Sequence, residues 1–109
     1  MKLQFDAISV TELPNFKGGE GVYRANIYTD ELGKIMRGRL VPGASIGTHT
    51  HEDSSEIIYV LSGTGKALYD GIGERLAPGD CHYCPKGHAH TLINDGEEDL
   101  VFFAVIPLQ

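Results

Sequence analysis

The chain has 109 residues, about one domain's worth, and a second core of normal size would not fit. With 41% hydrophobic and 22% charged residues it can bury a core, which excludes a disordered tail. Nine Lys and Arg residues against fifteen Asp and Glu residues leave a net charge of −6, and an acidic chain without a basic cluster is a poor nucleic-acid binder.

Neither a membrane span nor a targeting segment is visible in the sequence. The longest apolar run, Leu100–Ile106, is far below the ~20 residues that cross a bilayer. Residues 1–6 contain no sustained apolar segment of the kind found in a secretory signal. We therefore expect no membrane contact and a cytoplasmic location.

The expected elements are short strands. Residues 1–21 are expected to form an N-terminal strand and loop, followed by a single barrel domain over residues 22–109. Runs rich in Val, Ile, Tyr and Thr lie between Gly and Pro residues, and this punctuation indicates an all-β sandwich or barrel. The runs are Val22–Thr29, Ile35–Val41, Glu56–Ser62, Gly65–Asp70, His88–Ile93 and Leu100–Ile106.

Two turns and two unusual strands stand out among these elements. Asp70-Gly71 is a pair typical of a tight hairpin, and residues 94–96 (Asn-Asp-Gly) predict another reversal. The runs 57–61 and 101–106 are apolar at every position, so both of their faces must be covered. Another sheet or another subunit can supply the second cover, and we favour a homodimer.

The two cysteines, Cys81 and Cys84, form a single C-x-x-C pair. A zinc ribbon needs a second pair, which the chain lacks. Residues three apart on a strand point to opposite faces, which opposes a mutual disulfide. We expect two small buried hydrophobic residues instead.

A group of histidines and one glutamate carries the candidate chemistry. His49 and His51 are two residues apart, so on a strand they share a face and both rings can reach one point. Glu56 follows after a gap long enough for a loop to return the chain as a neighbouring strand, and His90 lies on another candidate strand. Three imidazoles and one carboxylate suit a divalent metal such as Fe, Mn, Co, Ni, Cu or Zn. Read alone, the same residues could be exposed loop histidines and a solvated charge.

Two spaced motifs favour the metal. The first, G-x5-H-x-H-x4-E-x6-G, is met by Gly43, His49, His51, Glu56 and Gly63. The second, G-x5-P-x-G-x2-H-x3-N, is met by Gly79, Pro85, Gly87, His90 and Asn94. Together they span residues 43–94, and the chain resembles the cupin family, with no position departing from either motif.

This resemblance implies a fold, a cofactor and an oligomeric state. The implied fold is a double-stranded β-helix, or jelly-roll cupin barrel, in a small single-domain member. His49, His51, Glu56 and His90 would hold one divalent transition metal per chain inside it. In an octahedral shell, four protein ligands leave two positions open for substrate, water or dioxygen, whereas a tetrahedral zinc would be closed. A frequently dimeric state, also known of the family, agrees with the two fully apolar runs.

Three residues are candidate acid/base groups beside the metal. His88 can share a face with His90, or it can lie exposed in the turn before it. His82 and Tyr83 lie on opposite faces of one strand, so at most one of them points inward.

Four further residues are expected to serve other purposes. Tyr59 should face away from the metal and pack in the core or at an interface. Asn94 is better explained by the turn that follows it than by a site role. Arg37 and Arg39 could clamp a carboxylate, but we favour the solvent side for both.

The predicted function is a metalloenzyme of the oxygenase or decarboxylase type that acts on a small oxygenated or carboxylated metabolite. Cupin dioxygenases and oxalate decarboxylases are the analogues that the resemblance offers. One alternative is a non-redox isomerase or lyase that uses the metal as a Lewis acid, with His88, His82 or Tyr83 as the proton-transfer groups. The other is a metabolite-binding cupin without turnover, because the fold alone does not decide among these functions.

Overall fold

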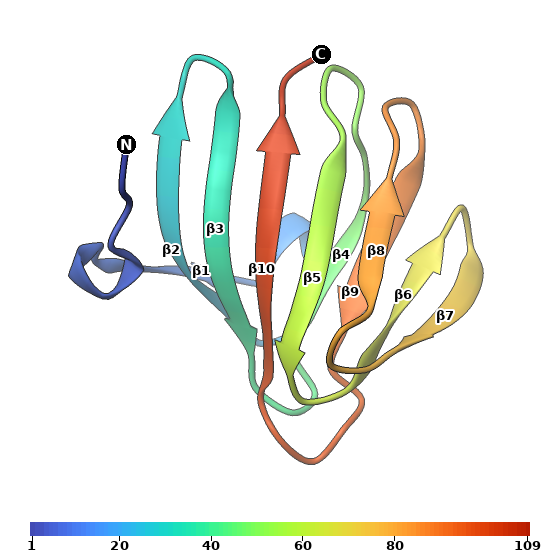
Figure 1. Cartoon of the computed structure of the whole chain (residues 1–109). Helices are drawn as coiled ribbons and strands as arrows, with labels where there is room; N and C mark the ends of the chain where they lie inside the picture. The colour runs from blue at the N-terminus through green and yellow to red at the C-terminus, as the bar shows by residue number, and fades with distance from the viewer.

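The computed structural model describes residues 1–109, whose strands form two antiparallel sheets packed face to face (Figure 1). Buried and exposed residues alternate along many of the strands, so that one face of each points into the core. The six-stranded sheet has the order β1 (Val10–Pro14), β2 (Val22–Asp30), β3 (Gly33–Leu40), β10 (Leu100–Pro107), β5 (Glu56–Ser62) and β8 (Cys81–Cys84). The four-stranded sheet has the order β4 (Ser45–Thr50), β9 (Ala89–Ile93), β6 (Gly65–Tyr69) and β7 (Ile72–Leu76). The two helices, η1 (Phe5–Ala7) and η2 (Phe16–Gly18), are single 3₁₀ turns, and neither could cross a membrane.

The predicted all-β jelly-roll architecture is confirmed, and each of the six predicted runs forms a strand. The two sheets are not joined by strand pairing into a closed barrel, so the molecule is a two-sheet sandwich. Behind β5 and β8 lie β4 and β9 (Figure 1). The hydrophobic core fills the space between the sheets, with Phe102, Leu40 and Leu92 among its most buried side chains.

Both predicted turns form for the expected reasons. Asp70 and Gly71 have φ angles of 47° and 82°, the positive values that a two-residue hairpin turn of this kind requires. Asn94 is fully buried, and its side-chain oxygen accepts a hydrogen bond from the Gly96 N–H at 3.0 Å. Its amide nitrogen donates to the carbonyl of Leu40 at 2.8 Å. Asn94 therefore stabilises the turn.

A bulge in β4 sets the orientation of the first histidine. Ile46 pairs with Leu92, but His49 pairs with His90, so β4 has one residue more than β9 between these two pairs. Residues three apart normally point to opposite faces, and the extra residue reverses this relation. As a result, Ile46 lies in the core and His49 also points into the sandwich.

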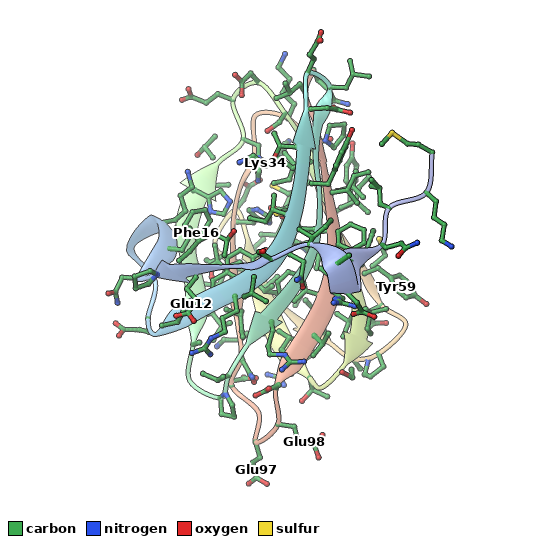
Figure 2. All side chains as sticks on the ribbon, turned by 90° about the vertical axis from the view of Figure 1, so that its left-hand side faces the viewer. Glu12, Phe16, Lys34, Tyr59, Glu97 and Glu98 are labelled. Atoms are coloured by element: carbon green, nitrogen blue, oxygen red, sulfur yellow. The ribbon has the colours of Figure 1, made fainter.

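The outer face of the six-stranded sheet is apolar around β5 and exposed in this chain. Ile57, Tyr59 and Leu61 point outward, as does Tyr83 on the neighbouring β8. The prediction that Tyr59 faces away from the histidine cluster is confirmed, and Figure 2 shows Tyr59 and Phe16 on opposite sides of the molecule.

The arginine side chains of β3 also point outward, as we favoured. Arg37 donates to a carboxylate oxygen of Asp6 at 2.8 Å, and Arg39 lies 3.8 Å from Asp99. Neither arginine is among the residues that line the cavity between the sheets.

Candidate metal centre

Four side chains from three strands and one loop end converge between the sheets. His49 comes from β4, His51 from the residue after it, Glu56 from the first position of β5, and His90 from β9. Their ligand atoms all lie within 4.8 Å of one another. We call these four residues the ligand cluster, and they could hold one metal ion.

Backbone contacts and a glycine place His51 and Glu56. The N–H of His51 donates to the carbonyl of His88, and its carbonyl accepts from Gly87, whose φ of 88° favours glycine. The following loop is bound to the C-terminal strand, because the N–H of Ser55 donates to the carbonyl of Pro107.

The expectation that Glu56 returns on a strand neighbouring β4 is wrong. Strand β4 lies in the four-stranded sheet, whereas β5 lies in the six-stranded sheet. The loop over residues 51–55 therefore crosses from one sheet to the other, and Glu56 meets the histidines from the opposite wall of the sandwich.

The hydrogen bonds of the three rings determine which nitrogen is free to bind a metal. Nδ1 of His49 lies 2.8 Å from the carbonyl oxygen of Gly47, and a carbonyl only accepts, so this nitrogen carries the proton. Nδ1 of His51 bonds the Ser54 hydroxyl at 2.9 Å, and Nδ1 of His90 bonds another ring at 3.0 Å. All three Nε2 atoms are left pointing into the cluster.

Distances within the cluster fit a transition metal. Nε2 of His90 lies 3.0 Å from Nε2 of His51, 3.2 Å from Nε2 of His49 and 3.0 Å from Oε1 of Glu56. Nitrogen and oxygen ligands at about 2.1 Å from an octahedral ion are separated by roughly 3.0 Å. Lone pairs that face one another at such distances repel unless a proton or a cation lies between them. The donor set therefore fits a divalent ion held by three imidazoles and one carboxylate.

The charges of the cluster also favour a cation. Burial would raise the pKa of Glu56, but hydrogen bonds from His51 and His90 lower it to about 2, so the carboxylate is ionised. Burial lowers the pKa of His49 and so favours the neutral, metal-binding form of its ring.

His82 is placed behind the cluster by a chain of hydrogen bonds. This buried residue points inward from β8, and its Nε2 lies 3.0 Å from Nδ1 of His90. Its Nδ1 lies 2.8 Å from Oε1 of Glu74 on β7. Because a carboxylate only accepts, His82 donates to Glu74 and accepts from His90. This chain fixes the tautomer and the orientation of His90, as carboxylate–histidine pairs do for metal ligands elsewhere.

His88 lies outside the cluster, in a different network. Its Nδ1 is 2.6 Å from a carboxylate oxygen of Asp70 and 3.2 Å from the hydroxyl of Tyr69, and its ring stacks on that tyrosine. The side chain of His88 is about half exposed. The third candidate, Tyr83, is exposed on the outer face of β8, away from the ligand cluster.

The two cysteines differ in their surroundings. Cys84 is buried next to Glu56 in the strand register, and burial raises its pKa to about 11, so it remains a thiol. Cys81 is exposed, which corrects the expectation that both would be buried. Both are free, and they point to opposite faces of β8.

A cavity of about 430 Å³ opens onto the cluster. His49, His51 and Glu56 contribute to its wall, whereas His82, His88 and Tyr83 do not. Its apolar wall comes mainly from β2, β3, β10 and the segment around η2, through Leu13, Phe16, Tyr23, Ile27, Met36, Ile46, Ile106 and Leu108. Besides Glu56, the charged side chains at the cavity are Lys17, Lys34, Glu52 and Asp53.

Several residues of the site were not identified from the sequence. Ser54 and Glu74 orient His51 and His82, and Tyr23 lines the cavity. The hairpin at residues 70–71 does predict that Glu74 shares a face with Ala67, although not that this face points inward. No sequence signal pointed to Ser54 or Tyr23.

Comparisons with known proteins agree with this geometry. The family model of the cupin domain matches residues 36–106. The chain is 33% identical, over 99% of its length and 94% of the relative's, to an "Oxalate-binding protein" of Thermotoga maritima. It is 34% identical to a "Germin-like protein" of Morus alba, over 63% of this chain and 35% of that one.

A solved structure is similar along the whole chain. The crystal structure of a protein from Thermotoga maritima, described as a predicted oxalate decarboxylase, superposes with a TM-score of 0.93 at 30% identity and full coverage of both chains. Because the family model and a relative of nearly the same length both match, and both expected motifs meet at one site, this chain belongs to the cupin family as a small single-domain member.

Proposed function

We propose that this chain binds one divalent transition metal through the ligand cluster and binds a small carboxylated metabolite on that ion. The observation that carries the proposal is the convergence of three imidazole Nε2 atoms and one buried carboxylate, whose ligand atoms all lie within 4.8 Å of one another. Four protein ligands leave an octahedral ion two further positions, which a chelating carboxylate can occupy. The donor set suits Fe, Mn, Co, Ni, Cu or Zn, and the supply in the cell decides among them.

The cavity supports a small ligand of the oxalate class. Its volume of about 430 Å³ is near the lower end of ordinary ligand sites, and apart from the ligand cluster its charged residues are exposed ones. The relative that is 33% identical to this chain carries the name "Oxalate-binding protein". Oxalate can chelate one ion with one oxygen from each carboxylate, so a metal with two open positions suits it.

Turnover of that carboxylate, of the oxygenase or decarboxylase type, is the second candidate function. The observation that favours it is the opening of the cavity directly onto the cluster, which gives a metabolite and dioxygen access to the same ion. A metal bound there would supply Lewis-acid and, for Fe or Mn, redox chemistry. An isomerase or lyase would need a proton-transfer group at the cavity wall. None of the three candidates, His82, His88 and Tyr83, lines the cavity.

Anaerobic purification from the native cell, followed by metal analysis and an oxalate titration, tests the proposal. We expect one divalent ion per chain and oxalate binding that disappears when the ion is removed with EDTA. Equal oxalate binding by metal-free protein, or none by the loaded protein, would overturn the proposal. Oxygen uptake would then indicate an oxygenase, carbon dioxide release without oxygen uptake a decarboxylase, and binding with neither a metabolite-binding cupin.

A homodimer is proposed for the outer face of the six-stranded sheet. Ile57, Tyr59, Leu61 and Tyr83 form an exposed apolar surface there, and monomeric proteins rarely leave such a surface uncovered. The N-terminal segment covers part of this sheet, where the rings of Phe5 and Phe103 contact each other edge to face. Sedimentation equilibrium tests the proposal, with twice the chain mass expected. The cytoplasmic location inferred from the sequence stays a prediction.

A further inference from the structure

Tyr23 is held rigidly in the cavity wall. It points inward from β2 and is only 3% exposed. Its ring packs between Phe16 and Phe102, with centroid distances of 5.7 and 5.8 Å. It also lies over Gly38, where an added Cβ would approach the Tyr23 ring to 2.8 Å. The ring position is therefore determined by packing on three sides.

The hydroxyl of Tyr23 lacks a good acceptor. Its one hydrogen-bonding contact is the thioether sulfur of Met36 at 3.7 Å, and sulfur of this kind accepts weakly. A buried hydroxyl without a strong partner is costly, and such groups in native proteins call for an explanation. Tyr23 lines the same cavity as His49, His51 and Glu56.

This hydroxyl remains a donor at any physiological pH. Burial raises the pKa of Tyr23 above its ordinary value, and the negative charge of Glu56 raises it further. The group therefore offers one O–H in the wall of the cavity that His49, His51 and Glu56 also line. It carries no charge that would compete with the ligand for the ion.

We propose that the Tyr23 hydroxyl donates a hydrogen bond to an oxygen of the bound carboxylate that does not touch the metal, and thereby selects dicarboxylates over monocarboxylates. This inference rests on the proposed function, because it assumes a carboxylate bound at the ligand cluster. Oxalate chelating through two oxygens keeps two more that can accept. Acetate has only two oxygens and can use both on the ion.

The substitution Tyr23→Phe tests this role, because it removes the hydroxyl and keeps the ring that packs against Phe16 and Phe102. The experiment is a calorimetric titration of oxalate and of acetate into Co²⁺-loaded protein. We expect the dissociation constant for oxalate to rise about tenfold or more, since hydrogen bonds to charged groups are among the stronger ones. The dissociation constant for acetate should change by less than about twofold, a small fraction of one such bond.

Two controls separate the possible outcomes. Tyr59→Phe removes an exposed hydroxyl on the outer face and should leave oxalate binding unchanged. The cobalt absorption spectrum and the melting temperature check that Tyr23→Phe still folds and holds the ion. Equal weakening for oxalate and acetate would overturn the inference, because it would indicate a general disturbance of the cavity.

Failure of the inference is distinguishable from failure of the proposed function. If the loaded wild type binds oxalate and Tyr23→Phe binds it equally well, the selective role of Tyr23 is refuted and the metal-bound carboxylate stands. If the metal-loaded wild type binds no oxalate, binding of a carboxylate on the metal is refuted, and the role of Tyr23 is refuted with it.

Discussion

The two faces of β5 show how one strand serves two different surfaces. Glu56, Ile58 and Val60 point inward and are at most 6% exposed, whereas Ile57, Tyr59 and Leu61 point outward and are 37–47% exposed. The inner face holds a buried negative charge at the edge of an apolar core. The outer face presents apolar side chains to solvent. The inner face therefore suits a cation, and the outer face suits an apolar cover.

Removing the buried negative charge of Glu56 from the inner face has the largest expected effect, a loss of metal affinity. Glu56→Gln keeps the shape of the side chain but deletes the one anionic ligand. We therefore expect the affinity for Mn²⁺ to fall by more than about a hundredfold, which exceeds the loss typical of residues that only hydrogen-bond to a metal ligand. Titration followed by electron paramagnetic resonance measures it. Glu97→Gln, in the exposed loop between β9 and β10 (Figure 2), is the matched control. If Glu56→Gln still bound one Mn²⁺ tightly, metal binding at the inner face would not depend on this carboxylate.

Breaking the hydrogen bond between His82 and His90 should lower metal affinity by less. His82→Phe preserves a buried ring but removes the acceptor for the Nδ1 proton of His90, so we expect metal affinity to fall by about tenfold. The same Mn²⁺ titration applies. Tyr83→Phe lies on the same strand but on the outer face and should bind as the wild type does. Unchanged affinity in His82→Phe would show that the cluster alone orients His90.

If the outer face forms the proposed dimer, a charge placed there should separate the two copies without affecting the site. Tyr59→Asp places a carboxylate in the centre of the apolar surface, and a central aromatic residue of an interface typically contributes about 2 kcal/mol or more. We expect the dimer dissociation constant to rise about thirtyfold, with metal content unchanged. Sedimentation velocity over a range of concentrations measures this. A stable dimer in this variant would place the interface elsewhere.

Removing the interaction between Asp70 and His88 should have the smallest effect, a slight loss of thermal stability. The hydrogen bond from His88, with that from the Ala89 N–H, lowers the pKa of Asp70 below its ordinary 3.8. Because the pKa of Asp70 is lower in the folded than in the unfolded state, its ionised carboxylate stabilises the fold at pH values above the unfolded-state pKa. This contribution is lost as the pH falls through the folded-state pKa. Asp70→Asn should therefore melt slightly below the wild type at pH 7 and equally with it near pH 2. Thermal melts followed by circular dichroism test this, and a difference that grows at low pH would contradict it.

The ligand cluster could be predicted from the sequence because all four residues stand at positions that the two motifs specify. His49 and His51 share a strand end, and Glu56 and Gly87 occupy fixed positions that the two motifs specify. The predicted hairpin at residues 70–71 also formed, since few residues adopt the positive φ angles that such a turn needs.

The remainder depends on contacts that a linear pattern does not contain. The alternation of β5 shows which residues share a face, but not that the strand lies in the opposite sheet from β4. The bulge before His49 has no signature in the alternation of that short strand. The link from His90 through His82 to Glu74 joins β9, β8 and β7, so only the packed sheets reveal it.

Binding of the metal by the ligand cluster is best tested by X-ray absorption at the metal edge of Co²⁺-loaded wild-type protein. We expect one cobalt per chain, with a scattering pattern of three imidazoles and additional oxygen ligands, and with oxygen ligands replaced when oxalate is added. A metal surrounded by fewer than three imidazoles, or one whose ligands do not change with oxalate, would contradict it.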